Sequence, residues 1–233
     1  QRSSRVRELS DFPIRTLEAN LAVLATRFPK AAEEIRSADP TGIFCHQKPN
    51  GNFTVGRKTS GKIEWLVGQP LESGGFPTVK EELDKRLKES ISRLYLMAGF
   101  GSGYVPTKVG LSFSHGIPLL VMEFDAALMR AALTLVDQRE LLGHGFFFFA
   151  VGKTMVDQAE DIFARFHLYM VSELCLVFSR TDWPSSIRVP YIEALHEIHH
   201  RKESQADRHD QNVRQFLAQP RAVKADSIRK VWI

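Results

Sequence analysis

The chain has 233 residues, a hydrophobic content of 43% and a charged content of 25%. This composition excludes a disordered or fibrous protein and allows one α/β domain with a sizeable core. The net charge is +4, but the basic residues are scattered and their two modest clusters lack interleaved aromatic residues, which disfavours nucleic-acid binding. No apolar run reaches the ~20 residues that span a bilayer, so we expect no membrane segment.

The two cysteines, Cys45 and Cys175, lie far apart and form no Cys-x-x-Cys motif. This usage predicts reduced, buried thiols in a cytoplasmic protein. The sequence begins with Gln1 rather than Met, so we expect a fragment or a processed product.

The first part of the chain predicts a small α+β subdomain over residues 10–75. Residues 1–13 are charged and patternless, and we expect a loose arm there. Apolar residues at helical spacing predict a helix over 14–36 that is kinked or split at Pro29. Three short extended segments separated by hairpin signals then predict an antiparallel meander at 42–47, 53–58 and 63–67.

A Gly/Pro-rich linker at 69–77 leads into a region of 76–185 in which helices and strands alternate. The predicted strands are 93–98, 118–123, 146–151 and 173–179, and the predicted helices are 78–90, 104–114, 125–142 and 155–166. This alternation predicts a Rossmann-like, mostly parallel sheet with helices on both faces. The strand at 146–151 is apolar on both faces, which is typical of a central parallel strand.

The C-terminal region, 186–233, predicts a helical connector. Its polar segment at 188–219 indicates two helices that meet near Ser204, and Pro220 ends the second. We expect this connector to lead into a further domain outside the chain.

The sharpest motif lies at the junction of the first two predicted parallel strands. Gly99, Gly101 and Gly103 follow the first strand, and Glu123 ends the second. Glycines let a backbone turn tightly against a ligand, and a carboxylate at this place can accept hydrogen bonds from ribose hydroxyls. The third glycine of the dinucleotide pattern falls at Tyr104, so the spacing is closer to that of S-adenosylmethionine methyltransferases.

Two interpretations of this motif stay open. In a methyltransferase, Glu123 would hold the ribose and the three glycines would bend around the methionine moiety of S-adenosylmethionine. An acid would then follow the third strand near the adenine, whereas this chain has 152–154, which reads Gly-Lys-Thr. The alternative is a tight strand-to-helix turn that packs closely and binds nothing.

Other catalytic motifs are weaker. Residues 196–200 fit His-Glu-x-x-His, but Arg201 and Lys202 follow directly, and no third histidine stands at the metzincin spacing. A solvated helix face is therefore favoured, and we predict no metal site. The chain contains neither Gly-x-Ser-x-Gly nor the full P-loop pattern Gly-x-x-x-x-Gly-Lys-Ser/Thr, so a serine hydrolase and a P-loop enzyme are disfavoured.

Several short motifs recur in the same order as in a known family. They lie at 20–24, 27–29, 50–51, 98–104, 121–125, 137–142 and 148–152. These motifs resemble the N-terminal region of the motility-associated-factor (Maf) proteins, bacterial flagellin glycosyltransferases related to the 6-hydroxymethylpterin diphosphokinase MptE-like family. One departure is 67–70, which reads Val-Gly-Gln-Pro where the family has a His-Ser-x-x-Asp-Pro-like element.

The resemblance implies transfer of a nonulosonic, sialic-acid-like sugar from a CMP-activated donor to Ser or Thr of flagellin in the cytoplasm. It also implies that catalysis occurs in a domain after residue 233, so no catalytic residue is assigned to this chain. Flagellin is then the expected protein partner. The rival hypotheses are an independent methyltransferase, with S-adenosylmethionine as cofactor, and a non-catalytic interaction domain.

Overall fold

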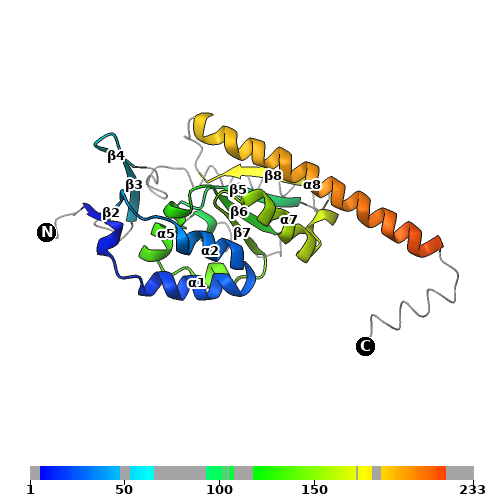
Figure 1. Cartoon of the computed structure of the whole chain (residues 1–233), viewed down its shortest axis with the longest axis horizontal. Helices are drawn as coiled ribbons and strands as arrows, with labels where there is room; N and C mark the ends of the chain where they lie inside the picture. The colour runs from blue at the N-terminus through cyan, green and yellow to red at the C-terminus, as the bar shows by residue number, and fades with distance from the viewer. Residues whose placement is uncertain are drawn as a thin grey trace.

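The computed structural model describes residues 6–47, 53–65, 93–101, 103, 105–107, 118–171, 173–179 and 185–218, without the side chains at 59, 64, 93 and 186. These residues form a four-stranded antiparallel sheet and a four-stranded parallel sheet, with helices packed around the latter (Figure 1). The predicted fold class is confirmed, because a Rossmann-like parallel sheet follows an antiparallel hairpin unit.

The antiparallel sheet has the order β1-β2-β3-β4. Its strands are β1 (Val6–Glu8), β2 (Ile43–Gln47), β3 (Phe53–Thr59) and β4 (Lys62–Trp65). The three predicted strands of the meander are therefore confirmed. The loose arm predicted for 1–13 is wrong at residues 6–8, since Val6 lies opposite His46 in an antiparallel pair. Three residues are too few to show an alternating pattern, so this strand could be recognised only from its pairing.

Helices α1 (Arg15–Arg27) and α2 (Pro29–Ser37) confirm the predicted split, with Phe28 between them. Pro29 is the first residue of α2, where its missing N–H breaks no helical hydrogen bond. The buried face of α1 belongs to the core of the parallel sheet, and both helices also contact α5 (Ala126–Leu135). The helices that the sequence analysis grouped with the meander therefore pack mainly with the parallel sheet. The predicted linker at 69–77 and helix at 78–90 lie outside the described residues, and the three-part division of the chain stays a prediction.

The parallel sheet has the order β7-β6-β5-β8. Its strands are β5 (Arg93–Ala98), β6 (Leu119–Glu123), β7 (Phe147–Val151) and β8 (Glu173–Phe178). All three pairings are parallel. The chain adds β6 and β7 on one side of β5 and then adds β8 on the other side, so the strand order reverses between β5 and β8. The central place expected for β7 is wrong within the described sheet, where β7 is an edge strand. It is apolar on both faces because helices cover both faces, and α2 lies along its outer edge.

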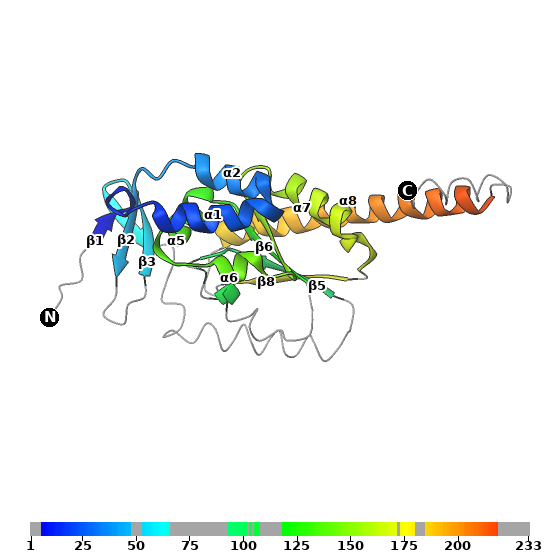
Figure 2. The same cartoon turned by 90° about the horizontal axis from the view of Figure 1, so that it is seen from below.

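The later helices are α6 (Arg139–Gly143), α7 (Met155–Phe166) and α8 (Ser185–Ala218), with 3-10 turns at Leu9–Asp11 and Leu168–Met170. The single helix predicted over 125–142 is wrong, because α5 and α6 are separate. The two helices predicted for 188–219 are one helix, α8, which extends past the sheet (Figure 2). Ser204 does not cap a new helix because its hydroxyl donates to the carbonyl oxygen of His200 at 3.1 Å. Of the helix predicted over 104–114, residues 105–107 are described and helical.

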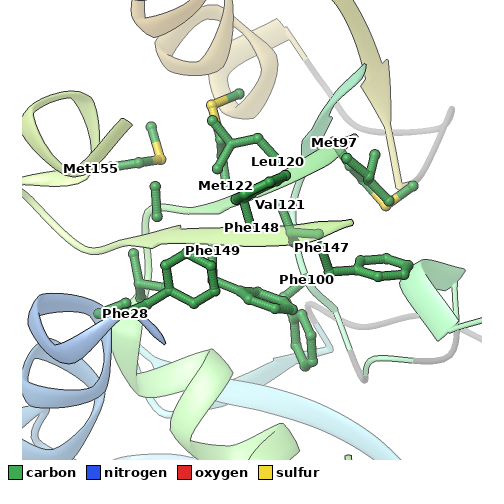
Figure 3. Packing of buried hydrophobic residues seen from close by; sticks show 14 of the residues in the cluster. Phe28, Met97, Phe100, Leu120, Val121, Met122, Phe147, Phe148, Phe149 and Met155 are labelled. Carbon is green, nitrogen blue, oxygen red and sulfur yellow. The ribbon is translucent and has the colours of Figure 1, made fainter. Parts of the chain in front are cut away.

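The core is built on both faces of the parallel sheet. Figure 3 shows Met155 of α7 near Leu120 and Met122 on one face, and Phe28 near Phe149 on the other. A smaller cluster joins the antiparallel sheet to α5 through residues including Val55 and Ala131. None of the described helices combines the length and the apolar character needed to cross a membrane.

Candidate functional site

The glycine turn and Glu123 meet at the C-terminal edge of the parallel sheet, as the motif predicts. Gly99, Gly101 and Gly103 have φ values of 84°, 60° and 79°, a left-handed conformation that disfavours any side chain. The N–H of Gly99 donates to the carbonyl oxygen of Met122 at 2.7 Å, which fixes the turn against β6. The turn follows β5 beside the point where the strand order reverses, which is where parallel α/β sheets bind ligands.

The carboxylate of Glu123 is buried, with 5% of the residue exposed, and its hydrogen bonds come from the chain itself. Oε2 accepts from the N–H of Phe100 at 3.0 Å, and Oε1 accepts from the N–H of Asp125 at 3.0 Å. The hydroxyl of Tyr191 donates to the same Oε1 at 3.3 Å. Both carboxylate oxygens are thus bound by protein groups in the position where a ribose was expected.

Burial raises the pKa of Glu123 from 4.5 to about 7. Desolvation is the largest cause, since it disfavours the charged form. The two backbone N–H groups act in the opposite direction because they stabilise the carboxylate, but they offset only part of the effect. Glu123 is therefore a carboxyl group that exchanges its proton close to neutral pH.

Tyr191 comes from the start of α8, and its hydroxyl contacts Oε1 of Glu123, whereas Phe100 of the turn contacts Oε2. Tyr191 is 3% exposed, and its ring packs against that of Phe124 with centroids 4.8 Å apart and planes at 63°. Burial and the nearby Glu123 carboxylate both raise the pKa of the phenol, so it stays a hydrogen-bond donor. The sequence predicts only a connector for this segment and no functional role for Tyr191. No local pattern could have identified it, because it lies 68 residues from Glu123 in the chain.

The side chain of Gln138 fills the space that Gly103 leaves. A Cβ added at Gly103 would lie 2.4 Å from Nε2 of Gln138 and 3.0 Å from the ring of Phe100. The hydroxyl of Thr107 is 2.6 Å from the carbonyl oxygen of Gly103 and 3.1 Å from Oε1 of Gln138. This glycine is therefore required by close packing within the chain.

Asn20 of α1 holds Gln138 in that position. It is fully buried, and its Nδ2 donates to the carbonyl oxygens of Leu133 at 2.7 Å and Val136 at 2.8 Å. Its Oδ1 accepts from the N–H of Gln138 at 2.9 Å. These three bonds terminate α5 and explain why α5 and α6 are separate helices. The sequence contains Asn20 in its first recognisable motif, but its role depends on residues more than a hundred positions away.

The His-Glu-x-x-His segment lies on α8. The Glu197 carboxylate accepts a hydrogen bond from Nε of Arg201 at 2.8 Å, and the same guanidinium pairs with Asp157 and Glu160 of α7. Among the described residues, no three or more His, Cys, Asp or Glu side chains are grouped as a metal would require.

Both cysteines are buried thiols, as predicted. Burial raises the pKa of Cys45 to about 12, so it is not a reactive thiolate. Comparisons with protein-family models, curated proteins and solved structures found no match to this chain.

Proposed function

We propose that the chain is the N-terminal, Rossmann-like part of a Maf-type glycosyltransferase that transfers a nonulosonic sugar to flagellin. In this proposal the chain does not bind a nucleoside and performs no chemistry itself. It is a rigid unit that positions a catalytic domain and contributes to binding of the protein acceptor. The order of the sequence motifs described above supports the family assignment.

One observation carries the non-catalytic role. A nucleoside at this edge of the sheet needs a carboxylate whose oxygens can accept from ribose hydroxyls. The three hydrogen bonds on Glu123 come instead from Phe100, Asp125 and Tyr191, and a buried phenol covers the carboxylate. Opening the site would require moving the start of α8 and exposing the buried ring of Tyr191, at a cost of several kcal/mol.

The shape of α8 supports a connecting role. Its first half is anchored, with Tyr191, Ala194 and Ile198 buried in the core of the parallel sheet. Its last turns extend past the sheet (Figure 2). Val213 and Leu217 in these turns are 41% and 62% exposed. A helix anchored at one end and exposed at the other suits a rigid link to another folded unit.

Calorimetric titration of the chain with S-adenosylmethionine, S-adenosylhomocysteine and CMP tests the non-catalytic role. We expect no binding of any of the three. Tight binding of the first two that is lost in Glu123→Ala, but kept in a variant of the exposed Glu193, would establish the methyltransferase alternative instead. That alternative is favoured by one observation, the position of the glycine turn beside the reversal of strand order.

The transferase role is tested in the source organism by deleting codons 6–218 in frame and measuring the intact mass of flagellin. We expect flagellin to lose the mass of its nonulosonic sugars, and expression of the undeleted gene from a plasmid to restore it. Unchanged flagellin mass after the deletion would refute the proposal. If the chain is instead a non-catalytic interaction domain unrelated to flagellin, we expect unchanged flagellin mass after the deletion and no binding of a nucleoside in the calorimetric titration.

A further inference from the structure

A cavity of about 190 Å³ lies at the outer edge of β7, between the start of α2 and the end of α7. It shares no residue with the glycine turn or with Glu123. Its interior is formed by the buried side chains of Ala31, Phe149 and Ile162, and its walls by Phe28 and Phe166. Figure 3 shows Phe28 beside Phe149, and the two rings form an edge-to-face pair with centroids 5.8 Å apart.

The rim of the cavity is positively charged. It carries three cations and one carboxylate, namely Arg27, Lys30, Arg165 and Asp161. Lys30 and Asp161 pair with each other. The net positive charge of the rim therefore comes from the guanidinium groups of Arg27 and Arg165. Within the described residues, neither guanidinium pairs with a carboxylate.

Both guanidinium groups are held in place by main-chain carbonyl oxygens. Arg27 donates to those of His144 and Gly145, the latter at 2.9 Å, and Arg165 donates to that of Arg27 at 2.7 Å. Each also lies against the ring of Phe166, at 5.7 Å and 5.2 Å from its centroid. Burial and the neighbouring positive charge of Arg165 lower the pKa of Arg27. An anion placed between the two would relieve this repulsion.

The size and lining of the cavity define the apolar part of a ligand. An apolar cavity of roughly 150 Å³ holds one benzene molecule, so 190 Å³ accommodates a single six-membered ring with a short substituent. The walls offer Phe28 and Phe166 for ring contacts, which favour aromatic over aliphatic groups. Guanidinium groups at the rim match the geometry of a carboxylate.

We propose that this cavity binds a free, small aromatic carboxylate, with the ring between Phe28 and Ile162 and the carboxylate on Arg165 and Arg27. The inference does not rest on the proposed function. It assigns a ligand site to the outer edge of the sheet, away from the place where a Rossmann-like fold binds nucleosides.

Methyl-labelled protein titrated with phenylacetate tests the proposal by NMR. We expect saturable shifts of the Ala31 and Ile162 methyl signals. Benzyl alcohol, which keeps the ring without the charge, and acetate, which keeps the charge without the ring, should each bind at least tenfold more weakly. Arg165 is exposed, so Arg165→Gln should fold normally and weaken phenylacetate about ten- to a hundredfold. Arg36→Gln, an exposed arginine at the far end of α2, is the matched control and should change nothing.

Filling the cavity provides a second test. Ile162→Trp should abolish the phenylacetate-induced shift of the Ala31 methyl signal. If the tryptophan variant fails to fold, Ala31→Leu fills the cavity from the opposite wall and should abolish the shift of the Ile162 methyl signal. Saturable shifts that depend on Arg165 and disappear on filling support the site. The proposal is overturned if phenylacetate causes no saturable shift at Ala31 or Ile162, or binds Arg165→Gln equally well. Binding of a peptide that ends in phenylalanine, without binding of phenylacetate, would also overturn it, because the occupant would then be a polypeptide.

Discussion

The hydroxyl oxygen of Tyr191 lies 3.3 Å from Oε1 of Glu123, joining α8 to the tip of β6 across 68 residues of sequence. This contact connects the anchored end of the long helix with the edge of the sheet where Rossmann-like folds bind their ligands. The contact also joins a buried acid to a buried phenol, so removing either side chain should measurably change the free energy of unfolding.

Truncation of Tyr191 should separate the hydrogen bond from the ring packing. Tyr191→Phe keeps the contact with Phe124 and removes the donor to Glu123, so we expect a loss of about 1 kcal/mol in the free energy of unfolding. Tyr191→Ala also removes the ring from the core and should cost about 3–5 kcal/mol. Urea unfolding followed by circular dichroism measures both. Tyr169→Phe, at a half-buried tyrosine, should stay within about 0.5 kcal/mol, and an equal loss there would argue against a specific role for Tyr191.

The raised pKa of Glu123 should make stability depend on pH in a defined direction. The folded chain holds this proton up to about pH 7, whereas the unfolded chain releases it near the ordinary pKa of 4.5. The contribution of Glu123 is therefore fully present below pH 4.5 and is lost as pH rises through 7. The difference between the two pKa values corresponds to about 3 kcal/mol.

Urea unfolding at a series of pH values tests this dependence. Glu123→Gln cannot titrate, so its free energy of unfolding should fall less steeply than that of the wild type between pH 4.5 and 7. Glu193→Gln removes an exposed glutamate of α8 and should keep the wild-type slope. Identical slopes in wild type and Glu123→Gln would show that the carboxyl is not buried as described.

Gly103 and Gly145 offer a matched pair of glycines. Gly103 has a φ of 79°, and an added Cβ would lie 2.4 Å from Gln138, whereas a Cβ at Gly145 would meet nothing within 4 Å. We expect Gly103→Ala to cost about 2–4 kcal/mol through backbone strain and the clash, and Gly145→Ala to stay within about 0.5 kcal/mol. Gln138→Ala should recover part of the loss in Gly103→Ala, because it removes the clash but not the strain. If Gly103→Ala is harmless, the turn is open and could admit a ligand.

Much of the fold could be predicted because its signals are local. The bounds of β5 and α7 agree with the predicted ranges 93–98 and 155–166, since an apolar run and a helical period are each visible within one segment. The positions of Gly103 and Glu123 at one sheet edge likewise follow from strand order alone.

The side chains that fill and cover the candidate site could not be predicted in this way. Gln138 fills the turn and Tyr191 covers the acid, but neither has a sequence signal that names its distant partner. The break between α5 and α6 was missed for the same reason, because Asn20 acts on it from 118 residues away. Helix propensity over 125–142 favours a continuous helix, and a buried tertiary hydrogen bond overrides it.

Asn20 should therefore be among the polar residues on which the fold depends most. Asn20→Ala leaves the carbonyl oxygens of Leu133 and Val136 and the N–H of Gln138 without their partner, and the bonds to Leu133 and Gln138 are buried. We expect a loss of about 3 kcal/mol or more, since each unsatisfied buried group costs about 1–3 kcal/mol. Ser37→Ala, which removes an exposed hydroxyl that bonds within α2, should cost less than about 0.5 kcal/mol.

Hydrogen exchange distinguishes a local role for Asn20 from a general loss of stability. In the wild type the N–H of Gln138 is bonded to Asn20 and should be protected, and Asn20→Ala should expose it more than the amides of β6. The loosened Gln138 would no longer fill the space beside Gly103, so Gly103→Ala should cost less in the Asn20→Ala background than in the wild type. Additive losses in the double variant would mean that Gln138 keeps its position without Asn20.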